Sequence, residues 1–405
     1  MARTPLGVSL AVAAILGTAC SRSPLAPQPG ANSGVSRETP GYDVIDLGTL
    51  GGDRTLPAAI NDSGIVVGSS QTADRRTLGF IYQKGVMRAL RASQTVYDES
   101  ADAINASGQI AGVVRDGRAV LRWDARTAAS DVQTFPTPAS PAPPPSRVVA
   151  IDAAGDMLVT LDDFVARAQG GVIRNGAWQD VGSLDVARAW TYPLAWNARG
   201  QIVGTSHVRH VAPTYEIFHP ILWQSGVLKD LGVLGTVTCG DAQADCAGGD
   251  AVDINAQGTV VGTVTGAAGL DRAFSWQDGI MHDLGAFEGH STRAMAINDR
   301  GQILFAVGVP DLGVFVWDNG SVQRVGPIGV SILARAFAED GAVAGEMQQS
   351  DGGGGGGGGG VHAFVWNAGV LTDLGPGRAT AINARGDIVG TDGGGLRGIL
   401  WKKRN

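Results

Sequence analysis

Short stretches of alternating hydrophobic and polar residues, separated by glycine-containing turns, run through most of this chain. The phrase AINDSGIVVG at 59–68 shows the pattern. One brief apolar segment precedes and another follows a turn made of Asn, two polar residues and Gly. The apolar segments are short and rich in β-branched residues, which favours strands over helices. Because an Asn side chain can bond the local backbone and Gly adopts a positive φ without strain, the phrase predicts a β-hairpin.

The same phrase recurs along the chain in eight copies. The position of the Asn is held by Asn61, Asn105, Asp152, Asn197, Asn255, Asn298, Ala338 and Asn383. A second phrase, HAFVWNAGVLTDLG at 362–375, interleaves with the first in varied forms and also predicts a hairpin, with Trp on its first strand. Each unit then holds four short strands in roughly 45 residues, the size of a β-propeller blade. The sequence therefore predicts an all-β protein, a β-propeller of about eight four-stranded blades.

The two ends of the repeat region complement each other. The stretch YDVIDLG at 42–48 is a DLG strand without a Trp partner, and RGILW at 397–401 is a Trp strand without a DLG partner. If the first strand completes the last blade, the ring closes without an exposed sheet edge. Seven blades or an open β-repeat array are the alternatives, since the third unit lacks the repeat Trp and the seventh has Ala338 in place of Asn. We assign residues 42–405 to this domain.

Three stretches carry a resemblance to a known family. HAFVW at 362–366, DLGTLGG at 46–52 and AINDSG at 59–64 resemble the repeats of bacterial extracellular HAF-repeat proteins. The resemblance covers about residues 42 to 401. It implies an exported repeat protein and brings no established activity, cofactor or catalytic residue.

The N-terminal segment has the pattern of an export signal. Residues 1–19 contain an Arg and an apolar run, followed by small residues before Cys20. The run is shorter than the about 20 residues that span a bilayer. The stretch GTAC at 17–20 resembles a lipobox, which predicts lipidation of Cys20, and ordinary cleavage after Ala19 is the alternative. Residues 20–41 are rich in Pro, Ser and Gly and predict a flexible tether. We expect an exported protein, in the cell envelope or extracellular, that is lipid-anchored at the outer surface or in the periplasm.

The cysteine content and the net charge bear on a disulfide, a zinc site and nucleic-acid binding. If Cys20 carries lipid, Cys239 and Cys246 remain as an even pair in an oxidising compartment, which predicts a disulfide. A zinc site is a poor alternative because no His lies nearby. The net charge of -7 and the scattered arginines argue against binding to nucleic acid.

The irregular insertions fall in the DLG-to-AIN and IVG-to-Trp connections, which should lie together on one face of the ring. Repeat proteins use such a face for binding. The candidate ligand-binding residues there are Trp190, Tyr192, His207, Arg209, His210 and Tyr215. Aromatic, His and Arg side chains can stack on a sugar or bind an acidic group. A solvated loop is the alternative, and the two histidines lack a third ligand for a metal. The repeated Trp residues, in contrast, hold a fixed place on a strand and should pack in the core.

The chain contains none of the motifs that mark common catalytic centres. There is no GxSxG, no HExxH and no phosphate-binding loop, so we assign no catalytic residue, metal or cofactor. We expect a monomeric, non-enzymatic binding module for a surface glycan or protein, whose only membrane contact is its lipid anchor. The alternative is a polysaccharide-active hydrolase or lyase with carboxylates at the propeller mouth.

Overall fold

Strands make up the regular structure of this protein. The computed structural model describes residues 39–90, 98–114, 119–127, 132–138, 145–162, 168–211, 215–239, 244–266, 269–285, 287, 289–308, 313–348 and 360–404. Within these ranges it contains 33 strands and no α-helix. No helix in the described part of the chain is long and apolar enough to cross a membrane. The predicted signal peptide at 1–19, Cys20 and most of the predicted tether lie outside the described residues.

Six four-stranded antiparallel sheets follow one another in chain order. The first three comprise β2 (Gly51–Ile60), β3 (Val66–Thr72), β4 (Thr77–Gln83) and β5 (Val86–Ala89); β6 (Ala103–Ile104), β7 (Gln109–Val114), β8 (Ala119–Asp124) and β9 (Val132–Pro136); and β10 (Pro145–Ile151), β11 (Met157–Asp162), β12 (Ala168–Arg174) and β13 (Ala177–Asp180). The next three comprise β14 (Thr191–Trp196), β15 (Ile202–Val211), β16 (Tyr215–Gln224) and β17 (Val227–Asp230); β20 (Gly249–Ile254), β21 (Val260–Thr265), β22 (Asp271–Gln277) and β23 (Ile280–Asp283); and β24 (Thr292–Ile297), β25 (Ile303–Val307), β26 (Gly313–Asp318) and β27 (Ser321–Arg324). A small hairpin of β18 (Thr238–Cys239) and β19 (Ala244–Asp245) projects between the fourth and fifth sheets.

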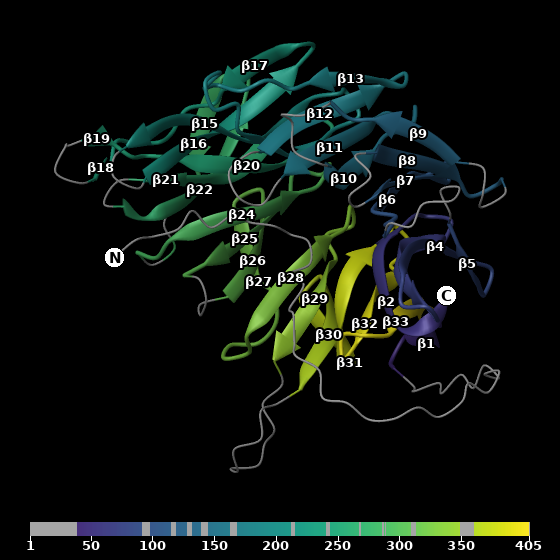
Figure 1. The fold of residues 1–405 in the computed structure, drawn as a ribbon. Helices are drawn as coiled ribbons and strands as arrows, with labels where there is room; N and C mark the ends of the chain where they lie inside the picture. Colours follow the sequence, from purple (N-terminus) through teal and green to yellow (C-terminus); the bar gives the residue numbers. More distant parts are fainter. Residues whose placement is uncertain are drawn as a thin grey trace, which may run out of the picture.

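The two ends of the described chain meet in a seven-stranded sheet. Its strands are β28 (Ile332–Phe337), β29 (Val343–Gln348), β30 (Val361–Asn367), β31 (Val370–Ile382), β32 (Ile388–Asp392), β33 (Gly398–Lys403) and β1 (Tyr42–Asp46). The long β31 pairs with β30 through its first half and with β32 through its second half, so it serves two four-stranded units. β1 pairs with β33, and Figure 1 shows β1 and β2 beside β32 and β33.

This arrangement confirms the predicted all-β propeller class. The pairing of β1 with β33 also joins the DLG strand at the start of the domain to the Trp strand at its end. The count of eight blades and the closed ring stay predictions.

A line of asparagine bonds links successive sheets and explains the recurring Asn. In each case the side-chain amide donates to the backbone carbonyl of the equivalent residue in the next unit. The bonds run from Asn61 to Asn105 (3.1 Å), Asn105 to Asp152 (2.6 Å), Asn197 to Asn255 (2.9 Å), Asn255 to Asn298 (3.4 Å), Asn298 to Ala338 (3.3 Å) and Asn383 to Asn61 (3.0 Å). The two remaining positions hold Asp152 and Ala338, whose side chains have no amide to donate. We call these bonds the asparagine belt.

The same asparagines also build the predicted hairpin turns. Oδ1 of Asn61 accepts hydrogen bonds from the backbone N–H groups of Ser63 and Ile65. Gly64 takes a φ of 75°, and its N–H donates to the carbonyl of Asn61. One side chain thus satisfies backbone donors in its own turn and a backbone acceptor in the next sheet.

The glycine at the end of the phrase IVVG is required for a different reason, namely the close approach of a neighbouring strand. A Cβ on Gly262 would lie 2.0 Å from the carbonyl oxygen of Asp250 on the neighbouring strand, and one on Gly390 would lie 1.9 Å from that of Arg378. A β-bulge follows each of these close approaches, between Ala251 and Asp253 and between Ala379 and Ala381. Only glycine permits the two strands to approach this closely.

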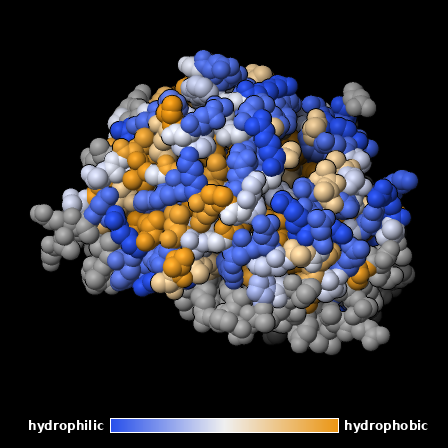
Figure 2. Space-filling view, turned by 90° about the horizontal axis from the view of Figure 1, so that it is seen from above, coloured by the Kyte–Doolittle hydropathy of each residue, from blue (hydrophilic) through white to orange (hydrophobic). Residues whose placement is uncertain are grey.

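The core lies between neighbouring sheets, as the fixed position of the Trp residues predicts. Trp123, Trp223 and Trp401 are at most 2% exposed. The indole of Trp401 also donates to the carbonyl of Leu374, which links the seventh and eighth units. Seen from above in Figure 2, hydrophobic residues gather to the left of centre on an otherwise hydrophilic surface. Val227 on β17, at the top of Figure 1, is one of the exposed apolar residues.

Candidate functional site

The sheet topology separates two kinds of connection. In each four-stranded sheet the turns after the first and third strands lie at one end, because all neighbours are antiparallel. The asparagine belt brings the first turns of successive sheets together on one face. The connection from β13 to β14 and the β15–β16 hairpin therefore lie at the opposite end of the fourth sheet. This is the face on which the sequence predicts the ligand site.

Most of the predicted ligand-binding residues gather there. Trp190 stacks on Phe218 with ring centroids 6.3 Å apart and an interplanar angle of 9°. Tyr192 lies against the same Phe218 ring at 6.3 Å. Trp190 and Tyr192 are partly buried, whereas Arg209 and His210 are exposed. The sixth residue, Tyr215, begins β16, and its side chain lies outside the described residues.

His207 occupies a position that differs from the prediction of a ligand contact. It is fully buried, with its ring edge-on to Trp190 and Phe218 at 5.4 Å from each. Its Nδ1 lies 3.0 Å from Asp185 and its Nε2 lies 2.6 Å from Glu216. A β-bulge between His207 and Arg209 interrupts the alternation of β15, so His207 faces inward while the next residues face solvent. His207 therefore supports the site from beneath.

Glu216 is the centre of the polar network. Its Oε1 lies 2.9 Å from Nδ1 of His210 and 2.5 Å from Nη1 of Arg188, while Oε2 faces His207. Burial raises the pKa of Glu216, but the hydrogen bonds from His207 and His210 and the charge of Arg188 outweigh it, so the pKa lies below the usual range. Asp185 faces the other ring nitrogen, so both nitrogens of His207 lie within hydrogen-bond distance of a carboxylate.

The carboxylate of Asp185 fixes the loop that precedes β14. It accepts a hydrogen bond from the backbone N–H of Ala187, which together with His207 lowers its pKa against the effect of burial. The loop carries Arg188, whose guanidinium lies over the Trp190 ring at 5.3 Å from the centroid. The loop, β15 and β16 thus hold the aromatic face of Trp190 in one orientation. We call Arg188, Trp190, Tyr192, His210, Glu216 and Phe218 the Trp190 patch.

The projecting hairpin is tied to the edge of this patch. Nη2 of Arg209 donates to the backbone carbonyl of Asp245 on β19 at 2.5 Å. Asp245 itself accepts from the N–H groups of Ala247 and Val237, and these bonds lower its pKa. Cys246, next to it, is disulfide-bonded. The side chain of Cys239 lies outside the described residues, so its pairing with Cys246 stays a prediction.

The residues that the sequence missed are Asp185, Arg188, Glu216 and Phe218. Glu216 and Phe218 stand two apart in YEIFHP, so a strand beginning at Tyr215 places both on one face. That signal was present in the sequence, but the partner strand and the register were not. Among the described residues, no group of three or more His, Cys, Asp or Glu side chains could hold a metal ion.

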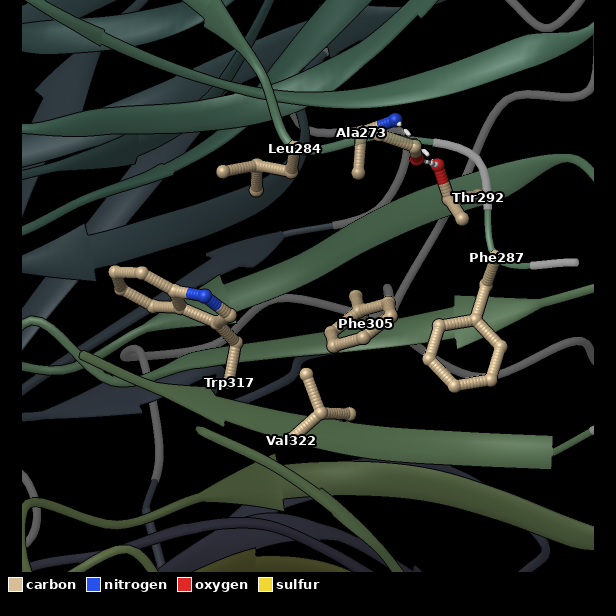
Figure 3. Close-up of a pocket in the computed structure, with 8 residues that line it drawn as sticks. Ala273, Leu284, Phe287, Thr292, Phe305, Trp317 and Val322 are labelled. Carbon is tan, nitrogen blue, oxygen red and sulfur yellow. Dashed lines mark hydrogen bonds between the residues drawn. The ribbon is translucent and has the colours of Figure 1, made fainter. Parts of the chain in front are cut away.

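A separate small pocket opens between the fifth and sixth sheets. Ala273, Leu284, Gly285, Phe287, Thr292, Phe305, Trp317 and Val322 line it, and Figure 3 shows the aromatic rings around the space. Its volume is about 50 Å³, against roughly 300 Å³ or more for pockets that bind a drug-sized ligand. Phe305 stands where six other units have the close-approach glycine, opposite Ala294, and stacks on Phe315. The pocket is thus a local departure from the repeat and is too small for a sugar ring.

Comparison with solved structures finds other β-propellers. The β-propeller domain of the Trilobed protease from Pyrococcus furiosus aligns with a TM-score of 0.50 and 10% identity, over 80% of this chain and 98% of that one. YCF48 bound to D1 peptide aligns at 0.44 and 12%, over 91% and 97% of the two chains. The WD40 β-propeller domain of Doa1 aligns at 0.43 and 13%, over 88% and 96%. At these identities the likeness shows the fold alone. No family model and no curated protein matches the chain.

Proposed function

We propose that this protein is a non-enzymatic binding module whose Trp190 patch binds a glycan. The observation that carries the proposal is the partly exposed Trp190 ring, which contacts Phe218 and Arg188 beside a network of charged hydrogen bonds. Sugars present an apolar face of C–H groups that stacks on an aromatic ring. A ring whose orientation is already fixed loses little entropy when the ligand binds.

The polar groups at the edge of Trp190 suit the hydroxyl groups of a sugar. Arg188 and His210 are donors and Glu216 is an acceptor, and the side chains of Arg188 and His210 are 37% and 38% exposed. Arg188 and His210 are held by the same carboxylate, so donors and acceptor lie within a few ångströms of one another. Such a set recognises neighbouring hydroxyls at a cost of little rearrangement.

A retention assay tests the proposal directly. Residues 41–405 are incubated with a panel of immobilised bacterial and plant polysaccharides, and both retained protein and released sugar are measured. We expect selective retention without release, and a loss of about tenfold in affinity for Trp190→Ala and for Arg188→Ala. Arg199→Ala is the matched control, since Arg199 is an exposed arginine in the first turn of the same sheet, at its other end.

The other outcomes are informative as well. Release of oligosaccharide would replace this proposal with the hydrolase or lyase alternative. Equal retention of the wild type, Trp190→Ala and Arg188→Ala would move the glycan site away from the patch. Retention by no polysaccharide would favour a protein ligand.

We further propose that the protein is exported, lipid-anchored through Cys20 and related to the HAF-repeat proteins. The apolar run, the stretch GTAC and the repeat phrases support this. Mass spectrometry of the mature N-terminus tests it. A lipidated Cys20, absent from a Cys20→Ala variant, is the expected result, and an unmodified N-terminus after Ala19 would refute the anchor.

A further inference from the structure

Arginine occupies one repeat position on the innermost strand of three units. The position lies five residues before the belt residue and holds Arg147 on β10, Arg293 on β24 and Arg378 on β31. In each case it precedes a β-bulge on the same strand and pairs with a residue of the second strand, namely Thr160, Ala306 or Thr391. The three arginines therefore have the same register and lie toward the same face as the Trp190 patch.

Two of these arginines are neutralised by a carboxylate. Nε of Arg293 donates to Oδ2 of Asp271 at 2.9 Å, and Arg293 adds a second bond to the same oxygen through Nη2. Nε of Arg378 donates to Oε2 of Glu346 at 2.7 Å. These bonds satisfy the usual requirement that a partly buried guanidinium be paired.

Arg147 differs from the other two. Within the described part of the chain its side chain has no hydrogen bond and no ion pair, although the residue is partly buried. Burial lowers the pKa of Arg147 despite the nearby charge of Asp102. Asp102 is engaged elsewhere, since its Oδ2 accepts a hydrogen bond from the backbone N–H of Val148 at 2.9 Å. The guanidinium of Arg147 is thus a partly buried cation that has no hydrogen bond to a protein acceptor within the described residues.

The neighbouring strand carries part of the proposed glycan site. β14 follows β10 as the next innermost strand, and the two strands lie in contact. The equivalent position on β14 holds Tyr192, a member of the Trp190 patch. A ligand that stacks on the patch and extends beyond β14 would therefore reach the strand that carries Arg147.

From this comparison we infer that Arg147 binds an anionic group, and that the ligand of this face is an acidic polysaccharide. The inference rests on the glycan-binding function proposed above. A carboxylate or a sulfate group presents two charged oxygens that match the planar fork of a guanidinium. A neutral sugar has no such pair of oxygens, and a lysine side chain has no such fork. Arg147 then supplies selectivity for the charge, while Trp190 supplies the stacking surface.

A matched pair of ligands tests the inference. Oligogalacturonate and its neutral methyl ester have the same sugar backbone and differ in charge, and binding of each to residues 41–405 is measured by calorimetry. We expect the wild type to bind the acid about tenfold more tightly than the ester, and Arg147→Gln to abolish that preference without weakening the ester. Arg199→Gln is the control, since it removes an exposed arginine from the fourth unit, at the opposite end of the sheet from the Trp190 patch.

Each further outcome decides the matter. An unchanged preference for the acid in Arg147→Gln would overturn the role of Arg147, and equal wild-type affinity for acid and ester would overturn the acidic ligand. If neither oligosaccharide binds, titration with sodium sulfate at constant ionic strength separates the two proposals. A rise in the melting temperature that Arg147→Gln loses would support an anion site that takes a simple anion, whereas equal responses would overturn it. The melting temperature without ligand serves as the folding check, and it should not fall in Arg147→Gln because the variant removes a partly buried charge that has no ion pair within the described residues.

Discussion

Replacing Asn383 by Ala tests whether the asparagine belt stabilises the fold. Asn383 joins the last unit to the first, since its amide donates to the carbonyl of Asn61 at 3.0 Å. Its Oδ1 accepts from the backbone N–H groups of Arg385 at 3.0 Å and Asp387 at 2.9 Å. The side chain is nearly fully buried, at 5% exposure, so water cannot readily replace these bonds.

The amide also donates to Oδ2 of Asp387 at 3.2 Å, so the side chain makes four hydrogen bonds from which the expected loss can be worked out. Each contributes about 1 kcal/mol net, which gives a loss of about 4 kcal/mol in the free energy of unfolding. The entropy of unfolding is about 2.1 cal/mol/K per residue, or roughly 0.76 kcal/mol/K over about 360 residues. The melting temperature of Asn383→Ala should therefore fall by about 5 °C.

Differential scanning calorimetry of residues 41–405 measures this change. Asn367→Ala is the matched control, because the amide of Asn367 makes an exposed bond of 3.2 Å to Asp340. We expect the control to shift by less than about 1 °C. Hydrogen exchange at the amides of Arg385 and Asp387 should also become faster in Asn383→Ala. A shift no larger than that of the control, with unchanged exchange, would refute the reasoning.

Three further predictions follow from the same repeat. Ala338→Asn should raise the melting temperature by about 1 °C, because the new amide can donate to the next unit as the other belt residues do, and a decrease would show that the seventh turn cannot accept the side chain. Gly262→Ala should lower the free energy of unfolding, measured by urea denaturation, by about 1 to 3 kcal/mol, because its Cβ would lie 2.0 Å from the carbonyl oxygen of Asp250. Gly279→Ala is the comparison, since Gly279 has open space around it and the variant reports only the strain of a positive φ. Burial raises the pKa of Asp253 from 3.8 to about 6. Between about pH 4 and 6 the folded protein therefore keeps a proton that the unfolded chain releases. The free energy of unfolding should fall by about 3 kcal/mol as the pH rises through that window. Asp253→Ala, the residue found at this position in other units, should remove this part of the pH dependence, and identical urea midpoint profiles for the two proteins would contradict the assignment.

The recurring phrases predicted the fold because each of their residues has a local task. Asn and Gly set the hairpin turn within five residues, and the Trp alternates inward on a short strand. The repeat length then selects a four-stranded unit, and the DLG and Trp strands at the two ends predicted the pairing of β1 with β33. The belt bonds could not be predicted, since they join residues some 40 or more positions apart, and the Asn383 bond spans 322 positions.

The candidate site shows the same division more sharply. Trp190, Tyr192, Arg209 and His210 stood out because aromatic and basic residues clustered in an irregular connection. Whether each side chain faces solvent depends on the bulge in β15, which has no clear signal in the sequence and turns His207 inward. The roles of Asp185 and Glu216 depend on strand pairing, which decides that two carboxylates face one imidazole.

The sequence by itself determined the all-β class, the four-strand unit and the face that carries the irregular connections, because these follow from periodicity and turn chemistry over short distances. Only the tertiary structure decided which polar groups are paired. Arg147, Arg293 and Arg378 are equivalent in the sequence, yet two of them meet a carboxylate and the third meets none among the described residues. Pairing across sheets depends on the positions of residues distant in the chain, and those positions are fixed only when the sheets pack together.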